Sequence, residues 1–254
     1  MRFGVIIIGD ELLSGKRRDR HLSRVIETLG AQGLELAWGL LLGDDAGDIT
    51  ATLRRTLAGA EAVFCFGGIG ATPDDRTRQC AAEAAGVTLA RHPDAVREIE
   101  SQFGPAAYPQ RIRMAELPAG SVIIPNPYNR IPGFTLGDHH FLPGFPDMAW
   151  PMLDWVLDRY YATQRPERAP VEHRLRLRGH YESELLTLME DFTRRFPDLR
   201  LSSLPTLAGG GPEIELGVRG APPAAAEGCA WLHGALDAAG VAWEPLDPPD
   251  GPGA

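Results

Sequence analysis

The chain has 254 residues, of which 44% are hydrophobic and 23% charged, and its formal net charge is −9. This negative balance argues against nucleic acid as a partner, because nucleic-acid binding normally rests on a basic face that neutralises phosphates. Three cysteines without metal-ligand spacing predict reduced, buried thiols instead of a disulfide framework or a zinc site. No apolar run approaches the roughly 18 residues of a membrane span, and Asp10 and Glu11 interrupt the first one. We therefore expect a cytoplasmic protein with neither nucleic acid nor a membrane as partner.

Strand-like and helix-like segments alternate through the first two thirds of the chain. This alternation predicts an α/β fold with a parallel sheet between helices on both faces, a three-layer arrangement covering residues 1–165. The expected elements are a strand at 3–8, a helix at 20–32, a strand at 34–42, a helix at 48–57, a strand at 62–66, helices at 77–85 and 94–103, short strands at 122–124, 133–136 and 140–142, and a helix at 147–160.

A small α+β second domain is expected over residues 166–246. A polar segment containing Pro166 and Pro170 suits a linker in front of it. The expected elements are a strand at 173–178, a helix at 182–196, strands at 199–204 and 213–219, and a helix at 224–239. Residues 247–254 are rich in proline and glycine and are expected to form a flexible tail.

A glycine-rich loop follows the buried third strand. Gly67, Gly68 and Gly70 precede Thr72 and a predicted helix at Thr77, so backbone N–H groups can converge on an anion such as phosphate. The segment is neither a Rossmann fingerprint nor a P-loop, because Pro73 takes the place of the last glycine and no Gly-Lys-Ser/Thr follows. A tight strand-to-helix turn alone would explain the glycines and one capping aspartate.

Two aspartates, Asp74 and Asp75, stand beside this loop. Carboxylates would repel a bound phosphate unless a divalent cation lay between them, and Mg²⁺ is typically held by one or two carboxylates together with substrate phosphates. The sequence therefore predicts a metal-assisted site for a phosphorylated small molecule.

Further candidates follow other strands of the predicted sheet. Since the carboxyl ends of parallel strands meet at one edge, where ligands bind in open α/β sheets, these segments should converge on the glycine loop. Helix capping is the alternative role of Asp44 and Asp45. The candidate ligand-binding residues at these strand ends are Gly9, Asp10, Glu11, Ser14, Gly15, Asp44, Pro143 and Gly144.

Two more groups have open alternatives. The basic cluster of Lys16, Arg17, Arg18 and Arg20 is as consistent with a solvated turn as with a phosphate contact. His139 and His140 are adjacent in a predicted strand and point to opposite faces, so they are assigned to packing and solvent instead of one metal ion.

Six segments in this order resemble the CinA-like proteins of the MoaB/Mog molybdopterin-binding superfamily: 9–15, 42–45, 67–77, 125–127, 132–134 and 142–146. The resemblance covers residues 1–165, and the segment from Gly179 onward resembles the family's small second domain. Full-length CinA proteins continue into a nicotinamide-mononucleotide deamidase domain. Nothing in this chain resembles that domain, so its activity is not expected here.

The resemblance implies residue roles. In the superfamily the matching loop grips the phosphate end of molybdopterin or a nucleotide, and its aspartate acts with Mg²⁺ in adenylyl transfer; Asp75 and Thr77 match that part. Asp44 resembles the second acidic position, and Ser14 with Gly15 resembles the first-strand contact. CinA-like domains are also associated with hydrolysis of ADP-ribose-type pyrophosphates.

The leading hypothesis is therefore a divalent-metal-dependent pyrophosphatase acting on ADP-ribose or a related dinucleotide. Asp75, Asp74 and Asp44 are its expected catalytic residues, with Asp75 and Asp44 on the metal. The alternatives are a module that binds molybdopterin or a nucleotide without catalysis, and a structural protein that uses the second domain as an oligomer interface; a homo-oligomer is expected.

Three departures from the family pattern border the predicted pocket. The family usually has Asn at His21, Pro at Ala71 and Gly-Thr-Ala at 129–131, where this chain has Asn-Arg-Ile. His21 is expected either to replace the polar contact or act as a base, or to be an exposed helix-start histidine without a catalytic role.

Overall fold

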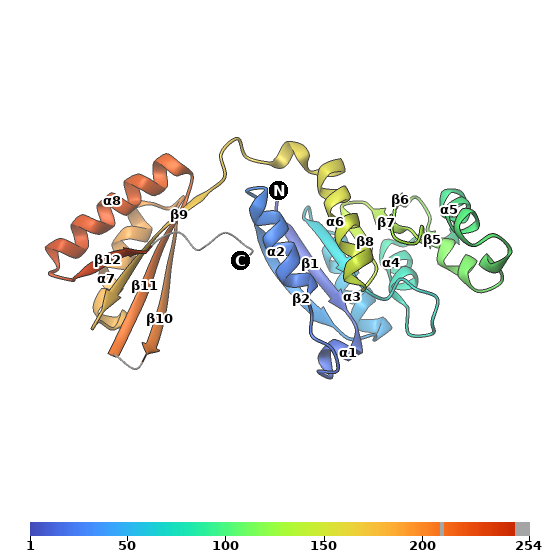
Figure 1. Cartoon of the computed structure of the whole chain (residues 1–254), viewed down its shortest axis with the longest axis horizontal. Coiled ribbons are helices and arrows are strands. Elements are labelled where there is room, and N and C mark those ends of the chain that lie inside the picture. The colour runs from blue at the N-terminus through green and yellow to red at the C-terminus, as the bar shows by residue number, and fades with distance from the viewer. Residues whose placement is uncertain (209–210, 247–254) are drawn as a thin grey trace. The chain divides into compact units, whose positions relative to one another are not determined.

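The computed structural model describes residues 1–208 and 211–246, and the chain divides after Arg165 into two units (Figure 1). The tail expected at 247–254 lies outside the described residues. Within the described ranges, no helix has both the length and the apolar character needed to cross a membrane.

A six-stranded mixed sheet forms the centre of the first unit. Its strand order is β2-β1-β3-β8-β7-β6. The first four strands in that order run parallel, whereas β7 and β6 are antiparallel to their neighbours. The strands are β1 (Phe3–Ile8), β2 (Leu36–Leu42), β3 (Ala62–Phe66), β6 (Val122–Ile124), β7 (Gly133–Leu136) and β8 (His139–Leu142).

The expectation of a wholly parallel sheet was therefore wrong at one end. The connection between β7 and β8 consists of Gly137 and Asp138 alone. Two residues suffice for an antiparallel hairpin, whereas a parallel crossover needs a dozen or more.

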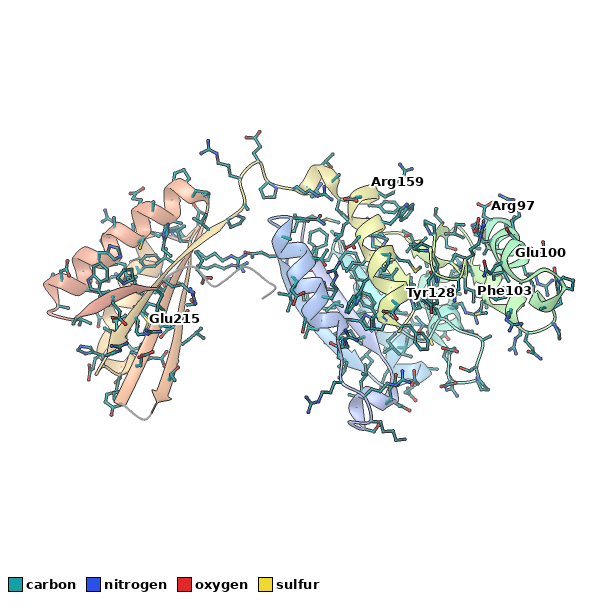
Figure 2. The ribbon with its side chains drawn as sticks, viewed as in Figure 1. Arg97, Glu100, Phe103, Tyr128, Arg159 and Glu215 are labelled. Carbon is teal, nitrogen blue, oxygen red and sulfur yellow. The ribbon has the colours of Figure 1, made fainter. Side chains whose placement is uncertain are left out.

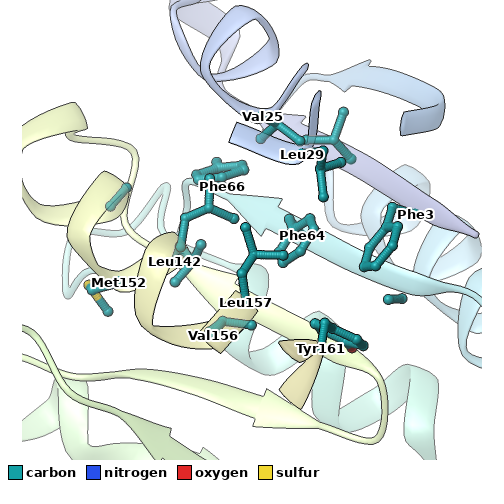
Figure 3. Packing of buried hydrophobic residues seen from close by; sticks show 14 of the residues in the cluster. Phe3, Val25, Leu29, Phe64, Phe66, Leu142, Met152, Val156, Leu157 and Tyr161 are labelled. Atoms are coloured by element: carbon teal, nitrogen blue, oxygen red, sulfur yellow. The ribbon is translucent and has the colours of Figure 1, made fainter. Parts of the chain in front are cut away.

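Helices cover both faces of this sheet, which confirms the three-layer α/β class. Alternation along β1 sends Phe3, Val5 and Ile7 into one core and Ile6 and Ile8 into the other. The first core packs α2 (His21–Ala31) and α6 (Pro146–Tyr160) against the sheet (Figure 3). The second core packs α3 (Ala46–Leu57), α4 (Thr77–Ala85) and α5 (Pro93–Phe103).

Two boundaries differ from expectation because of helix termini. β2 begins at Leu36 instead of 34, since the Leu34 amide donates to the Leu29 carbonyl at 2.9 Å and belongs to the C-terminal turn of α2. α3 begins at Ala46 instead of 48, since the Asp45 carboxylate accepts the Asp48 amide at 2.9 Å as an N-cap.

Residues 86–121 form an excursion that the sequence pattern did not predict beyond the helix at 94–103. It comprises β4 (Leu89–Arg91) paired with β5 (Glu116–Pro118), α5, and the 3₁₀ helices η1 (Gly104–Ala107) and η2 (Arg111–Ala115). Figure 2 shows Arg97, Glu100 and Phe103 along α5. The strands have three residues each, too short for a period-two pattern to be recognised.

His139 and His140 are both buried, with 2% and 1% of their surfaces exposed, so the expectation that one faces solvent was wrong. They do point to opposite faces, but both faces are covered by helices. His139 Nε2 lies 2.9 Å from Thr56 Oγ1 of α3, and His140 Nε2 lies 2.7 Å from the hydroxyl of Tyr161, which follows α6.

Acid should destabilise the fold through these two histidines. Burial lowers the pKa of His139 to about 4 and that of His140 to about 3, from an ordinary 6.5. The unfolded chain therefore takes up more protons below pH 6.5, and folded stability is lost as the pH falls from there towards 4. We expect the free energy of unfolding in urea to drop by about 2 kcal/mol per histidine between about pH 7.5 and pH 5. His139→Gln should remove the contribution of one histidine from this fall in the free energy of unfolding. An unchanged pH dependence in that variant would contradict the prediction.

The second unit is a small α+β layer, as expected, with one further strand. β9 (Val171–Arg178), β10 (Arg200–Ala208), β11 (Gly211–Gly220) and β12 (Trp243–Leu246) form an antiparallel sheet in the order β10-β11-β9-β12. Helices α7 (Glu182–Arg195) and α8 (Pro222–Ala238) share a core with the sheet that includes Leu175, Phe192 and Leu232.

Candidate functional site

The glycine loop leaves the carboxyl end of β3 and is held from both sides. The Gly67 amide donates to the Leu142 carbonyl at 3.0 Å and so extends the sheet by one residue. Among the residues that the structure describes, the amides of the next four residues, 68–71, donate to no protein acceptor. Gly68, Ile69 and Gly70 also line the cavity described below, so their N–H groups, unlike that of Gly67, are available to an anion.

Thr77, fully buried at the start of α4, shapes the loop from below. Its hydroxyl donates to the Gly67 carbonyl at 3.0 Å and its amide donates to the Gly68 carbonyl at 2.9 Å. Both carbonyls are thereby engaged on the protein side of the loop. Thr77 is not among the residues that line the cavity described below, so its role is to hold the loop and not to touch the ligand.

Arg78 is the main support that sequence reasoning missed. It is 3% exposed and donates to three carbonyls: Gly70 at 2.6 Å, Arg113 at 2.6 Å and Glu116 at 2.9 Å. Burial lowers the pKa of its guanidinium, although the charges of Glu116 and Asp75 oppose that change. The side chain therefore ties the glycine loop to the excursion at 86–121.

Replacing Arg78 with methionine should lower the free energy of unfolding in urea by about 3 kcal/mol, because three buried carbonyls lose charged donors. Arg76→Met is the matched control, since Arg76 is exposed on the same segment. Its effect should stay within about 0.5 kcal/mol. Equal effects of the two substitutions would contradict the role assigned to Arg78.

Asp75 closes the turn between the loop and α4. One carboxylate oxygen, Oδ2, accepts the Thr72 amide at 2.9 Å and also the Thr72 hydroxyl. The Gly70 Cα lies close by, since a Cβ built there would come within 2.4 Å of the same oxygen. Asp74, next to it, is exposed and lines the cavity.

Asp44 and Asp10 join the ends of β1 and β2 into one acidic wall. The Asp10 amide donates to Asp44 Oδ2 at 2.9 Å, and the Asp44 amide donates to Asp10 Oδ1 at 3.0 Å. Burial raises the pKa of the Asp44 carboxyl, and the negative charges of Asp10, Glu11 and Asp74 raise it further, against the opposing hydrogen bond from Asp10. Helix capping was the alternative role for both Asp44 and Asp45. Asp45 caps α3, whereas Asp44 lines the cavity described next.

These strand-end loops surround one cavity of about 370 Å³, which we call the glycine-loop pocket. Its charged lining consists of the acids Glu11, Asp44, Asp74 and Asp75 together with Arg17. Its apolar and uncharged lining includes Met114, Asn126, Asn129, Ile131 and Met148. The pocket therefore combines acids and unengaged amides with side chains suited to a ring system.

Most of the predicted ligand-binding residues line this pocket: Gly9, Glu11, Gly67, Gly68, Gly70, Thr72, Pro143 and Gly144. Asp10, Ser14, Gly15 and Thr77 do not. Asp10 and Thr77 support pocket residues, whereas Ser14 and Gly15 are exposed. Asn126 was visible in sequence within the matching segment 125–127, and Asn129 as a departure from the family pattern; Met114 and Met148 carried no signal.

His21 is buried, with 5% of its surface exposed, so its interpretation as an exposed helix-start residue was wrong. Its ring stacks on Phe66 at 4.4 Å, and Nε2 lies 3.2 Å from the Gly144 carbonyl. Burial lowers the pKa of His21, which favours the neutral ring that donates through Nε2. The histidine thus makes a polar contact beneath the strand-end turn.

Comparison with known proteins agrees with this geometry. The family model described as "Probable molybdopterin binding domain" matches residues 4–162. The chain belongs to this molybdopterin-binding domain family. The match covers the first unit, which holds every residue of the glycine-loop pocket.

Relatives of this family member are CinA-like proteins, which confirms the resemblance. The chain is 33% identical over 210 residues to a CinA-like protein of Geobacter metallireducens, covering 80% of this chain and 51% of that protein. It is 36% identical over 165 residues to a CinA-like protein of Anaeromyxobacter sp. (strain K), covering 62% of this chain and 40% of that protein. The chain thus spans about half or less of these curated relatives.

A solved structure supports the fold of the first unit. The protein CinA of unknown function from Thermoplasma acidophilum has 28% sequence identity and a TM-score of 0.57, with 62% of this chain and 98% of that chain covered.

Proposed function

We propose that the glycine-loop pocket binds a phosphorylated nucleotide or pterin and, with a divalent cation, hydrolyses a pyrophosphate of the ADP-ribose type. The observation that carries this proposal is that three residues with unengaged amides, Gly68, Ile69 and Gly70, line one cavity together with Asp44 and Asp74. Amides attract a phosphoryl group and carboxylates repel it, so the two sets bind one ligand only through a shared cation.

A divalent cation fits the donor set. Four carboxylates face the pocket, and these are the oxygen ligands that Mg²⁺ and related ions prefer. Burial raises the pKa of Asp44, and the negative charges of Asp10, Glu11 and Asp74 raise it further. Within residues 1–208 and 211–246, no three His, Cys, Asp or Glu side chains are grouped to hold a metal by themselves. Asp44 and Asp75 would therefore share the ion with ligand phosphates and water.

The residues of this chain would divide the reaction between them. The loop amides would hold the phosphoryl oxygens, and the cation would supply charge neutralisation and a more acidic water. Attack of water on one phosphorus would break the bridging P–O bond and would yield AMP and a sugar phosphate. The wall with Met114, Ile131 and Met148 would enclose a base or pterin ring.

The test is AMP release from ADP-ribose by the purified full chain with Mg²⁺, Mn²⁺ or Co²⁺, followed by chromatography. We expect turnover with metal and none after chelation. Absence of turnover with all three metals would reject the hydrolase.

Binding without catalysis is the second candidate, and one observation favours it. Asp75 uses Oδ2 to accept two hydrogen bonds from Thr72, so this carboxylate already has a structural task. A rise in melting temperature with ADP-ribose or a pterin phosphate, without any hydrolysis, would establish this function instead.

A further inference from the structure

A second cavity adjoins the glycine-loop pocket. It has a volume of about 390 Å³ and shares Ile8, Glu11, Arg17 and Gly144 with the first one. We call it the arginine pocket, because Arg17, Arg18 and Arg20 line it. A ligand of dinucleotide size can therefore extend from one cavity into the other without leaving the protein surface.

The charge of this second cavity is opposite to that of the first. Its two acids are Glu11, which it shares, and Asp19. Asp19 is engaged as a helix cap, since its carboxylate accepts the amides of His21 at 2.9 Å and Leu22 at 3.0 Å. Within the part of the chain that the structure describes, Arg17 and Arg18 form no ion pair. Their cationic groups are therefore available to a ligand.

Arg20 is placed differently. Its guanidinium lies over the Trp150 ring at 5.1 Å, which fixes one side of the cavity. That contact leaves the charge unneutralised, because an aromatic face attracts a cation without cancelling it.

The inner wall of the arginine pocket contains buried side chains that are held in place by packing and hydrogen bonding. His21, 95% of whose surface is covered, stacks on Phe66 and holds the Gly144 carbonyl. Its other ring nitrogen, Nδ1, is enclosed and has no hydrogen-bond partner among the described residues. Buried polar atoms are normally paired, so the wall of this cavity contains one polar atom that no described protein group satisfies.

Gly144 lines both cavities and lies next to the glycine loop. A Cβ built on it would lie 3.5 Å from the Gly67 Cα, and Gly67 begins the glycine loop. A group that binds against Gly144 therefore lies close to the backbone of the glycine loop.

We propose that the arginine pocket binds a second phosphate of the ligand whose pyrophosphate occupies the glycine-loop pocket. This inference rests on the proposed function and narrows its substrate class. The preferred ligand is a dinucleotide-type pyrophosphate with an additional phosphate on one of its two halves. Because three arginines face this cavity, the additional phosphate binds there without a metal ion.

The experiment compares three ligands by titration calorimetry on the full chain with Ca²⁺: ADP-ribose, ADP-ribose 2′-phosphate and ADP-ribose 1″-phosphate. We expect at least one phosphorylated form to bind about tenfold more tightly than ADP-ribose, as charge-assisted hydrogen bonds to a phosphate provide. Which form gains affinity identifies the half that enters the arginine pocket.

Variants locate the effect. The Arg17→Ala/Arg18→Ala double variant should lose the preference while its melting temperature stays close to that of the native chain, since both residues are exposed. Arg55→Ala removes a charge at an exposed position of α3 and should keep the preference for the phosphorylated ligand.

The other outcomes separate this inference from the proposed function. Equal binding of all three ligands would overturn it and leave the proposed function standing. A preference that survives in the double variant would overturn the placement. No binding of any ligand would remove both proposals. Binding of a phosphorylated form alone, lost in the double variant, would support the arginine pocket without the hydrolase.

Discussion

Asp75→Asn is expected to lower AMP release from ADP-ribose by about 100- to 1,000-fold, which is the usual range for removing one electrostatic group from a reacting centre. The substitution keeps an oxygen that can accept from Thr72 and removes only the negative charge. Asp44→Asn should have an effect of similar size, because it removes the other carboxylate expected to share the cation. Initial rates across a Mg²⁺ titration provide the measurement.

Two comparisons make this result specific. Glu27→Gln, at an exposed position of α2 outside the pocket, should leave the rate unchanged. If Asp75→Asn acts by loosening the loop instead, its melting temperature will fall while excess Mg²⁺ restores nothing. A native rate in both aspartate variants would exclude a carboxylate-held cation.

Gly67→Ala should destabilise the fold by about 3 kcal/mol or more and abolish ligand binding. Gly67 has φ +101°, and a Cβ there would lie 2.2 Å from the Ile8 carbonyl oxygen in the neighbouring strand. Backbone strain alone costs about 1–3 kcal/mol. The clash adds to it because the Ile8 backbone belongs to the buried sheet and cannot move aside. Urea unfolding measures the first effect and calorimetry the second.

Gly86→Ala separates strain from crowding. Gly86 ends α4 with φ +68°, yet a Cβ there meets nothing within 4 Å. The free energy of unfolding of this control variant should fall by about 1 kcal/mol, from backbone strain alone, and the variant should still bind the ligand. Equal losses in the two variants would show that close approach of the loop to β1 has no special importance.

The position of the site was predictable from sequence because it depends on chain order and strand direction. Buried strands at 3–8 and 62–66 end in Gly9 and Gly67, and parallel neighbours must bring those ends together. The glycines and aspartates at those strand ends are recognisable in the sequence as candidate ligand-binding residues. The same logic failed for β7 and β8, where loop length and not residue pattern decided the direction.

The supports of the site were not predictable in the same way. Arg78 looks like any polar residue of a helix, and only the path of residues 113–116 past α4 makes its three carbonyl contacts possible. His21 follows five charged residues, yet the turn at Gly144 covers it. Both depend on segments more than thirty residues away, about which local patterns carry no information.

The reciprocal hydrogen bonds between Asp10 and Asp44 hold two carboxylates at short range. Their mutual repulsion opposes the hydrogen bonds that join the ends of β1 and β2. The divalent cation proposed above would weaken this repulsion, so its addition should raise the melting temperature of the protein.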